Sequence, residues 1–284
     1  MTTRETPTRK TIAILGAAGR MGWPIAKSMA RAGHHVLLAD EAGEDCPPSA
    51  RKLPSLVATI RRGATRANLE IVSSSREASW EADIIVPAVP FEVQAEVARR
   101  IQDVVVGKIV ISMINPLNKT CDGLLTSPAT SAAEVLAHDL PHSKIVKAFN
   151  TIPSAHIERP MVAGKIVDVF VAGDDDEAVS TVMQLVRDAG FNPVFVGGLA
   201  MSRTLENMMV LLISLCARNQ YLEPVGWKVV HDPNTPGADH PRDEGITRGH
   251  AESSPAKPRH EEHVVRNHKS SSHIDKRVYH GRHK

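Results

Sequence analysis

The sequence predicts an α/β fold: a Rossmann-type, doubly wound sheet with helices on both faces, followed by a small C-terminal α/β unit and a disordered tail. Short apolar and β-branched runs alternate with helix-like segments, which is typical of parallel sheets. Several runs are apolar throughout, as expected for strands covered on both faces. Residues 232–284 contain no Leu, Met, Phe or Trp and cannot build a core. The expected strands are 11–15, 35–39, 84–88, 109–112, 144–149 and 167–172.

The first strand leads into a loop with glycines at 16, 19 and 22, and a helix is expected over about 21–32. In this arrangement Gly16 permits a tight turn, Gly19 lets the backbone approach a pyrophosphate, and Gly22 lets the helix pack closely on the strand. The free N–H groups and the dipole of the helix N-terminus favour binding of the phosphates. The sequence therefore predicts a dinucleotide site, with Ala18, Arg20 and Met21 completing the loop.

The end of the second strand carries Asp40 and Glu41, where an acidic side chain normally accepts hydrogen bonds from the adenosine ribose. Two carboxylates disfavour a 2′-phosphate, so this pair favours NAD over NADP, although Arg20 could offset the repulsion. Both NAD and NADP therefore stay open as cofactors.

Polar residues at the ends of later strands should meet the nicotinamide end of the dinucleotide. Ala88, Val89 and Pro90 follow the strand 84–88, and Pro87 is expected to end it because proline lacks a ladder donor. Asn115, Asn150 and Thr151 are candidate positioning groups. They could equally be ordinary loop caps.

Two later helices begin with capping patterns, Ser131 to Glu134 and Asp174 to Glu177, and should run to about 140 and 189. A last helix, about 202–217, is apolar around most of its circumference from Met208 onward. Such a helix is buried in a core or in a homodimer interface.

Composition excludes several classes of protein. The tail has ten Lys/Arg against eight Asp/Glu, so the net charge of +2 arises there, and the balanced body offers no basic face for nucleic acid. Three scattered cysteines favour a reducing cytoplasm, and the apolar run 208–217 is too short for a membrane span. The histidine-rich tail has only loose metal-ligand spacing, so no metal is predicted.

His156 is expected to be an exposed loop histidine, and no catalytic residue is predicted. We divide the chain into a dinucleotide-binding domain (10–150), a small acceptor-side unit (151–231) and the tail (232–284).

Several motifs together resemble one family. They are the GxxGxxG loop, Asn115-Pro-Leu, Ser131-Ala-Ala-Glu, Lys147-Ala-Phe-Asn-Thr-Ile-Pro, Val171-Ala-Gly-Asp-Asp-Asp-Glu, Gly197-Gly-Leu-Ala-Met-Ser-Arg and Gly226-Trp-Lys. This order resembles the NADPH-dependent reductases of the deazaflavin coenzyme F-420 and, more distantly, the cytoplasmic domain of the STEAP metalloreductases.

The resemblance implies hydride transfer between C4 of a nicotinamide and C5 of a deazaflavin, held face to face. It implies an acceptor site lined by Asn150, Thr151, Ile152, Pro153, Leu199, Ser202 and Arg203. This chain departs from the family in having Asp40-Glu41-Ala42 in place of a Ser-Arg-Arg segment, and Asn150 where some members have histidine. A flavin-like acceptor is thus also considered. An NAD-dependent reductase of a small imine or carbonyl, and a non-catalytic NAD-binding sensor, are the alternative functions.

Overall fold

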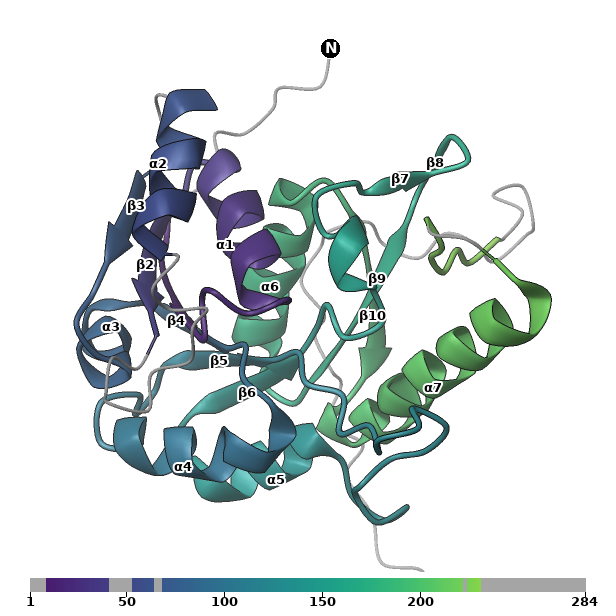
Figure 1. The fold of residues 1–284 in the computed structure, drawn as a ribbon. Coiled ribbons are helices and arrows are strands. Elements are labelled where there is room, and N and C mark those ends of the chain that lie inside the picture. The colour runs from purple at the N-terminus through teal and green to yellow at the C-terminus, as the bar shows by residue number, and fades with distance from the viewer. Residues whose placement is uncertain (1–8, 41–52, 64–67, 222–223, 231–284) are drawn as a thin grey trace, which may run out of the picture. The chain divides into compact units, whose positions relative to one another are not determined.

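An eight-stranded sheet forms the centre of the protein in the computed structural model, which describes residues 9–40, 53–63, 68–221 and 224–230. The strand order is β10-β9-β6-β5-β4-β1-β2-β3. Strands β1 to β6 all run parallel, and β9 enters antiparallel to β6 (Figure 1). The strands are β1 Thr11–Leu15, β2 His35–Ala39, β3 Asn68–Ile71, β4 Ile84–Pro87, β5 Ile109–Ser112, β6 Lys144–Lys147, β9 Asp168–Gly173 and β10 Asn192–Gly197; Met161–Val162 (β7) and Lys165–Ile166 (β8) form a small separate hairpin.

The helices cover the sheet on both faces, as the continuous apolar strands predict. They are α1 Gly22–Arg31, α2 Leu53–Gly63, α3 Ser75–Glu81, α4 Phe91–Ile101, α5 Ala132–Asp139, α6 Asp176–Asp188 and α7 Ser202–Asn219. Ile12 and Ile14 of β1 pack in one cluster with α1, α2 and α6. Ala13 and Leu15, which point the other way, pack in a second cluster with α3, α4 and α5. The predicted doubly wound α/β fold is therefore confirmed.

Strand β9 overhangs the end of its neighbour. Its pairing with β6 joins Val146 to Gly173 and Lys147 to Ala172. Because the pair is antiparallel, the beginning of β9 lies beyond the carboxyl end of β6, and β10 extends there beside it. Helix α7 begins beside these two strands and runs obliquely away from them (Figure 1), and Leu205 near its start packs on Phe170 and Ala172 in a third cluster. The overhang thus carries a helix to the edge of the sheet where the parallel strands end.

Most expected elements occur within two residues of the predicted bounds. Strand β6 stops at Lys147 because Phe149 has a left-handed backbone (φ 61°) and takes the chain out of the sheet. Pro87 is the last residue of β4, paired with Leu15, as expected. The predicted cap of α6 is one residue out: Asp175, not Asp174, accepts the Ala178 N–H (2.8 Å).

Helix α7 is longer than expected. It reaches Asn219 and ends where Gln220 adopts a left-handed conformation. Together with the short turn η3 (Leu199–Met201), it is long and apolar enough to cross a membrane by length and composition, a test that the core helices of globular proteins also pass. Glu41 and the predicted tail, 232–284, lie outside the described residues.

Candidate functional site

The loop between β1 and α1 has the close packing that its glycines predict. Gly16 has φ +81°, and a Cβ there would lie 2.8 Å from the Ala88 carbonyl oxygen. A Cβ on Gly22 would lie 2.2 Å from the Gly16 carbonyl oxygen, and one on Gly19 would lie 3.0 Å from the same atom. The first turn of α1 therefore sits directly on the loop. No side chain caps this helix at Met21 in the described structure. Gly19, Arg20 and Met21 line the cavity at the strand ends, so the positive N-terminal end of the helix lies at that cavity.

Asp40 lies beside this loop, directly after β2. Its carboxylate accepts a hydrogen bond from the Ala18 N–H at 2.5 Å. Burial raises the pKa of Asp40, and the Ala18 hydrogen bond partly opposes that rise. A half-buried acid is thus held at the position expected for a ribose partner, eighteen residues after Gly22.

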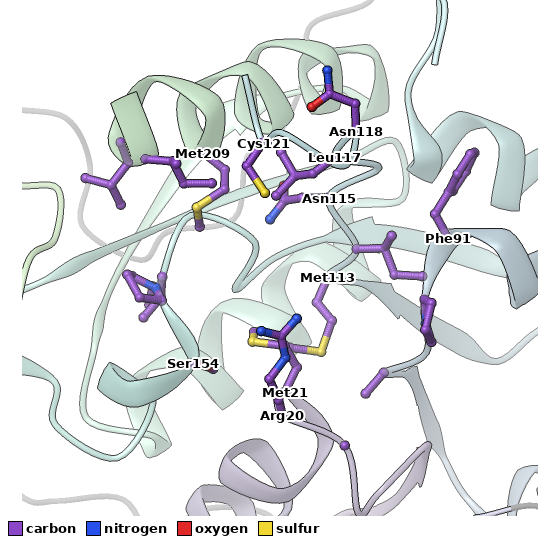
Figure 2. Close-up of a pocket in the computed structure, with 18 of the residues that line it drawn as sticks. Arg20, Met21, Phe91, Met113, Asn115, Leu117, Asn118, Cys121, Ser154 and Met209 are labelled. Atoms are coloured by element: carbon purple, nitrogen blue, oxygen red, sulfur yellow. The ribbon is translucent and has the colours of Figure 1, made fainter. Parts of the chain in front are cut away.

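A cavity of about 960 Å³ opens from the phosphate loop at the carboxyl ends of the strands. Figure 2 shows Arg20, Met21 and Met113 on one side of it and Met209, Cys121 and Leu117 on the other. Nine of the predicted site residues line it: Gly19, Arg20, Met21, Ala88, Val89, Pro90, Asn115, Ile152 and Pro153. The predicted crevice therefore exists, and residues from five separate chain segments form it.

Few of the described lining residues can exchange a proton. Arg20 and Glu92 are the charged residues among them, and Cys121, Cys216 and Tyr221 complete the ionisable ones. The other lining side chains are mostly apolar. Such a cavity suits the binding of flat rings and a hydride transfer that needs no acid or base from the protein.

Asn115 and Asn150 do not both reach the cavity. The Asn115 side-chain amide donates to the Asn150 carbonyl oxygen (2.7 Å), and the Asn150 amide donates to Asn115 Oδ1 and to the Leu205 carbonyl oxygen (both 2.9 Å). Asn150 and Thr151 are each 1% exposed and lie beneath the cavity floor. The Asn150 amide and the Thr151 hydroxyl therefore face the protein interior.

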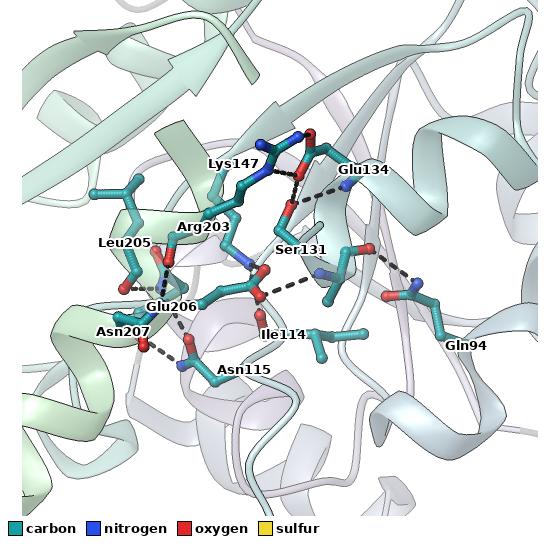
Figure 3. A network of polar contacts seen from close by, with 12 residues as sticks. Gln94, Ile114, Asn115, Ser131, Glu134, Lys147, Arg203, Leu205, Glu206 and Asn207 are labelled. Carbon is teal, nitrogen blue, oxygen red and sulfur yellow. Dashed lines mark hydrogen bonds and ion pairs between the residues drawn. The ribbon is translucent and has the colours of Figure 1, made fainter. Parts of the chain in front are cut away.

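A buried ion pair lies next to these amides and was not expected from the sequence. Lys147 donates from Nζ to Glu206 Oε1 and to the Ile114 carbonyl oxygen, both at 2.6 Å. Glu206 Oε2 accepts the Ala132 N–H at 3.1 Å (Figure 3). Both side chains are fully buried, and burial lowers the pKa of Lys147 while Glu206 opposes the effect. The sequence signal was a lysine between Val146 and Ala148 in an otherwise apolar run.

Besides Asn150 and Thr151, three further predicted acceptor residues do not line this cavity. Arg203 instead forms a two-point ion pair with Glu134, including a 2.8 Å bond from Nε to Oε2 (Figure 3), and this pairing lowers the pKa of Glu134. The Leu199 N–H donates to Asp174 Oδ1 (2.9 Å), and Ser202 is buried. The neighbouring turns of α7 line the cavity in their place.

The expectation for His156 was wrong. It is 3% exposed, because the turn η2 (Ser154–His156) lies between the buried residues Ile152 and Ile157 and carries His156 inward with them. The described residues contain no group of three or more His, Cys, Asp or Glu placed to hold a metal ion, and the histidine-rich tail lies outside that part of the chain.

Much of the cavity wall comes from residues that no motif identified. Cys121 lies in the loop after β5, and Met209, Leu212 and Cys216 lie on α7. Their signal is only an apolar helix and a loop of mixed composition. The folding of β9 and α7 brings the three helix residues to the cavity.

Several known proteins are similar to this chain in sequence. Residues 11–116 match the family model described as NADP oxidoreductase, coenzyme F-420-dependent. The F-420-dependent NADP reductase of Methanocaldococcus jannaschii is 28% identical over 72% of this chain and 91% of its own length. Its counterpart in Methanothermobacter marburgensis is 26% identical over 74% of this chain and 93% of its own length. Metalloreductase STEAP3 of Rattus norvegicus is 33% identical but over 39% of this chain and 22% of its own length.

Solved structures show the same fold. A putative F-420-dependent NADP reductase from Arthrobacter sp. FB24 has a TM-score of 0.62 and 23% identity, covering 74% of this chain and 94% of that one. An imine reductase from Myxococcus stipitatus has a TM-score of 0.53 at 16% identity, covering 74% of this chain and 63% of that one. The resemblance seen in the motifs is thus confirmed: residues 11–116 match the family model of the coenzyme F-420-dependent NADP oxidoreductases, and the STEAP metalloreductases are more distant matches.

Proposed function

We propose that the protein is an oxidoreductase that transfers a hydride between a nicotinamide dinucleotide, NADP(H) or NAD(H), and the deazaflavin ring of coenzyme F-420 or a related flavin. The observation that carries this proposal is the cavity itself. It begins at the phosphate loop, it is walled mainly by apolar side chains, and its described lining offers neither a histidine nor a lysine. The names of the similar reductases support the same pair of reactants.

The phosphate loop fits a dinucleotide. Side chains at Gly16 or Gly22 would fill the space in which the loop and helix meet, and α1 presents an end without a side-chain cap. In this proposal the residues from Gly16 to Gly22 bind the pyrophosphate and Asp40 binds the adenosine ribose. Arg20 is exposed at the cavity edge, where its guanidinium can pair with a phosphate.

The strand ends then orient the reacting ring. Ala88, Val89 and Pro90 follow β4 and lie beside the loop, so their backbone and apolar side chains hold one face of a flat ring away from water. When bound, the nicotinamide supplies the hydride chemistry. The protein contributes proximity, orientation and exclusion of water.

The acceptor binds against the opposite wall in this proposal. Ile152 and Pro153 form its lower part, and Met209, Leu212 and Ile213 of α7 form its upper part. Thioether side chains adapt to the edges and faces of conjugated rings, which suits a deazaflavin or flavin. Leu199, Ser202 and Arg203 lie at the start of α7 and outside the cavity lining, so in this proposal they do not touch the acceptor.

Anaerobic mixing of the purified protein with NADPH or NADH and with coenzyme F-420, FMN or FAD tests this function. Loss of nicotinamide absorbance together with reduction of one acceptor is the expected result. Binding of the dinucleotide without turnover of any acceptor would favour the NAD-binding sensor. Activity on small imines or carbonyls alone would favour the other alternative, which calls for a more polar cavity than the one described.

We also infer that the enzyme acts in the cytoplasm, and that the outer face of α7, where Leu211 is 50% exposed, contributes to a homodimer. Sedimentation of the wild type and of Leu211→Glu tests the dimer. A monomer in the variant and a dimer in the wild type are expected. A monomeric wild type would refute it.

A further inference from the structure

Two segments that line the cavity, the chain that follows β5 and helix α7, are joined behind the lining by a buried ion pair. Lys147 Nζ reaches the Ile114 carbonyl oxygen on the wall that follows β5, and in the same geometry it reaches Glu206 on α7 (Figure 3). Ile114 lines the cavity. The ammonium group therefore contacts both segments from behind, and Lys147 is not among the described lining residues.

Glu206 belongs to the same helical face as the cavity lining of α7. Residues three and four apart in a helix lie on one face, and Glu206 is followed at these intervals by Met209, Ile213 and Cys216. Those three side chains line the cavity. A displacement of Glu206 along or away from β6 thus displaces the acceptor wall directly.

The pair is more suited to fixing a position than to adding stability. Both groups are fully buried, and the cost of removing two charges from water offsets much of their attraction. Replacement of such a pair by apolar residues is often neutral for stability. What the pair does supply is a set of short, directed contacts, since Glu206 also accepts the Ala132 N–H at the start of α5.

We propose that Lys147 and Glu206 are positioning residues of the acceptor site, whose buried ion pair sets the spacing between the wall after β5 and the wall on α7. The Asn115–Asn150 amide contacts help to hold the same floor, but they reach α7 only at the Leu205 carbonyl oxygen. The ion pair is the contact that holds the cavity-facing side of the helix. This inference rests on the proposed function for the identity of the acceptor, and its structural part can be tested without it.

The test uses the double variant Lys147→Met with Glu206→Gln. Methionine keeps the length and apolar stem of lysine, and glutamine keeps an oxygen for the Ala132 N–H. No unpaired charge is therefore left in the core, and the variant should fold. Lys144→Met is the matched control: it removes a lysine from the same strand, where Lys144 pairs with Asp175 and Glu177 away from the cavity.

Two measurements judge the proposal. The first is the KM for coenzyme F-420 or FMN alongside the Kd for NADPH. In the double variant we expect the acceptor KM to rise at least tenfold, with the dinucleotide Kd within twofold of wild type. A merely structural role would weaken both ligands or neither.

The second measurement needs no acceptor. Cys121 and Cys216 line the cavity, so their rates of reaction with Ellman's reagent, assigned by peptide mass, report its width. We expect the rate at one or both to rise at least fivefold in the double variant and to stay unchanged in Lys144→Met. Unchanged rates at both thiols in a folded double variant would overturn the proposal, whatever the activity. A wild type that reduces none of the acceptors would instead count against the proposed function, and the thiol rates would still decide the role of the pair.

Discussion

Replacing Gly22 by alanine tests the phosphate loop most directly. The new Cβ would lie 2.2 Å from the Gly16 carbonyl oxygen and 2.9 Å from Ala17 Cα, and backbone atoms cannot rotate away. Alanine in a helix gains up to about 1 kcal/mol over glycine. Overpacking costs about 1 to 3 kcal/mol, so the cost of the clash should exceed the gain in helix propensity, and α1 should shift away from the loop. We expect lower thermal stability and a dinucleotide Kd raised at least tenfold, equivalent to about 1.4 kcal/mol.

Gly33→Ala is the control for this prediction. Gly33 has φ +98°, and no heavy atom lies within 4 Å of the place that an alanine Cβ would take, so this substitution causes backbone strain without a clash. It should lower the stability and keep the wild-type dinucleotide Kd. Calorimetric titration with NADPH and NADH, together with thermal denaturation, separates the two effects. Wild-type affinity in Gly22→Ala would refute our account of how the helix and loop meet.

Three further predictions concern charged groups. Asp40→Ser with Glu41→Arg should raise the ratio of kcat/KM for NADPH to kcat/KM for NADH at least about tenfold, because acidic charge is removed and a phosphate partner is added. An unchanged ratio would contradict the placement of the ribose beside Asp40. Burial lowers the pKa of His34 below its ordinary 6.5, and Asp188 opposes this effect. As the pH drops below about 6.5, His34 of the unfolded chain is protonated before that of the folded chain, so the free energy of unfolding should fall. Urea unfolding at pH 7.5 and 5.5 should show this fall in the wild type and not in His34→Gln. The buried carboxylate of Asp168 accepts hydrogen bonds from Asn192, Lys228 and the Val229 N–H. Asp168→Asn should therefore lower the free energy of unfolding by about 2 kcal/mol and expose residues 224–230 to limited proteolysis. An unchanged digestion pattern would show that other contacts hold this segment.

The central sheet could be predicted well because its strands are buried on both faces. The first strand is apolar at every position from 12 to 15, and the glycine loop after it indicates that a helix and a second parallel strand follow. The edge strand β3 carries no such signal, since Leu69 alone is buried in it. The bounds of that strand, and those of α2, α3 and α4, therefore come from the structure alone.

The candidate site could be predicted only on its dinucleotide side. Its residues follow one another in a short loop and at strand ends, where sequence order and spatial order agree. The α7 wall depends on the antiparallel return of β9, which no pattern in the sequence indicates. For the same reason the strand-end pattern predicts Asn150 at the surface of the cavity, although its amide is turned inward toward Leu205.

The overhang of β9 bears on how the enzyme moves. In many dehydrogenases the substrate wall belongs to a second domain, and a hinge brings it to the cofactor. Here the helix that forms this wall rests on strands hydrogen-bonded into the same sheet as the phosphate loop. Separating the two would break the pairing of β6 with β9. Ligand exchange should therefore proceed through adjustments of side chains such as Met209 and Tyr221 rather than through hinge opening, and scattering profiles with and without NADPH should superimpose.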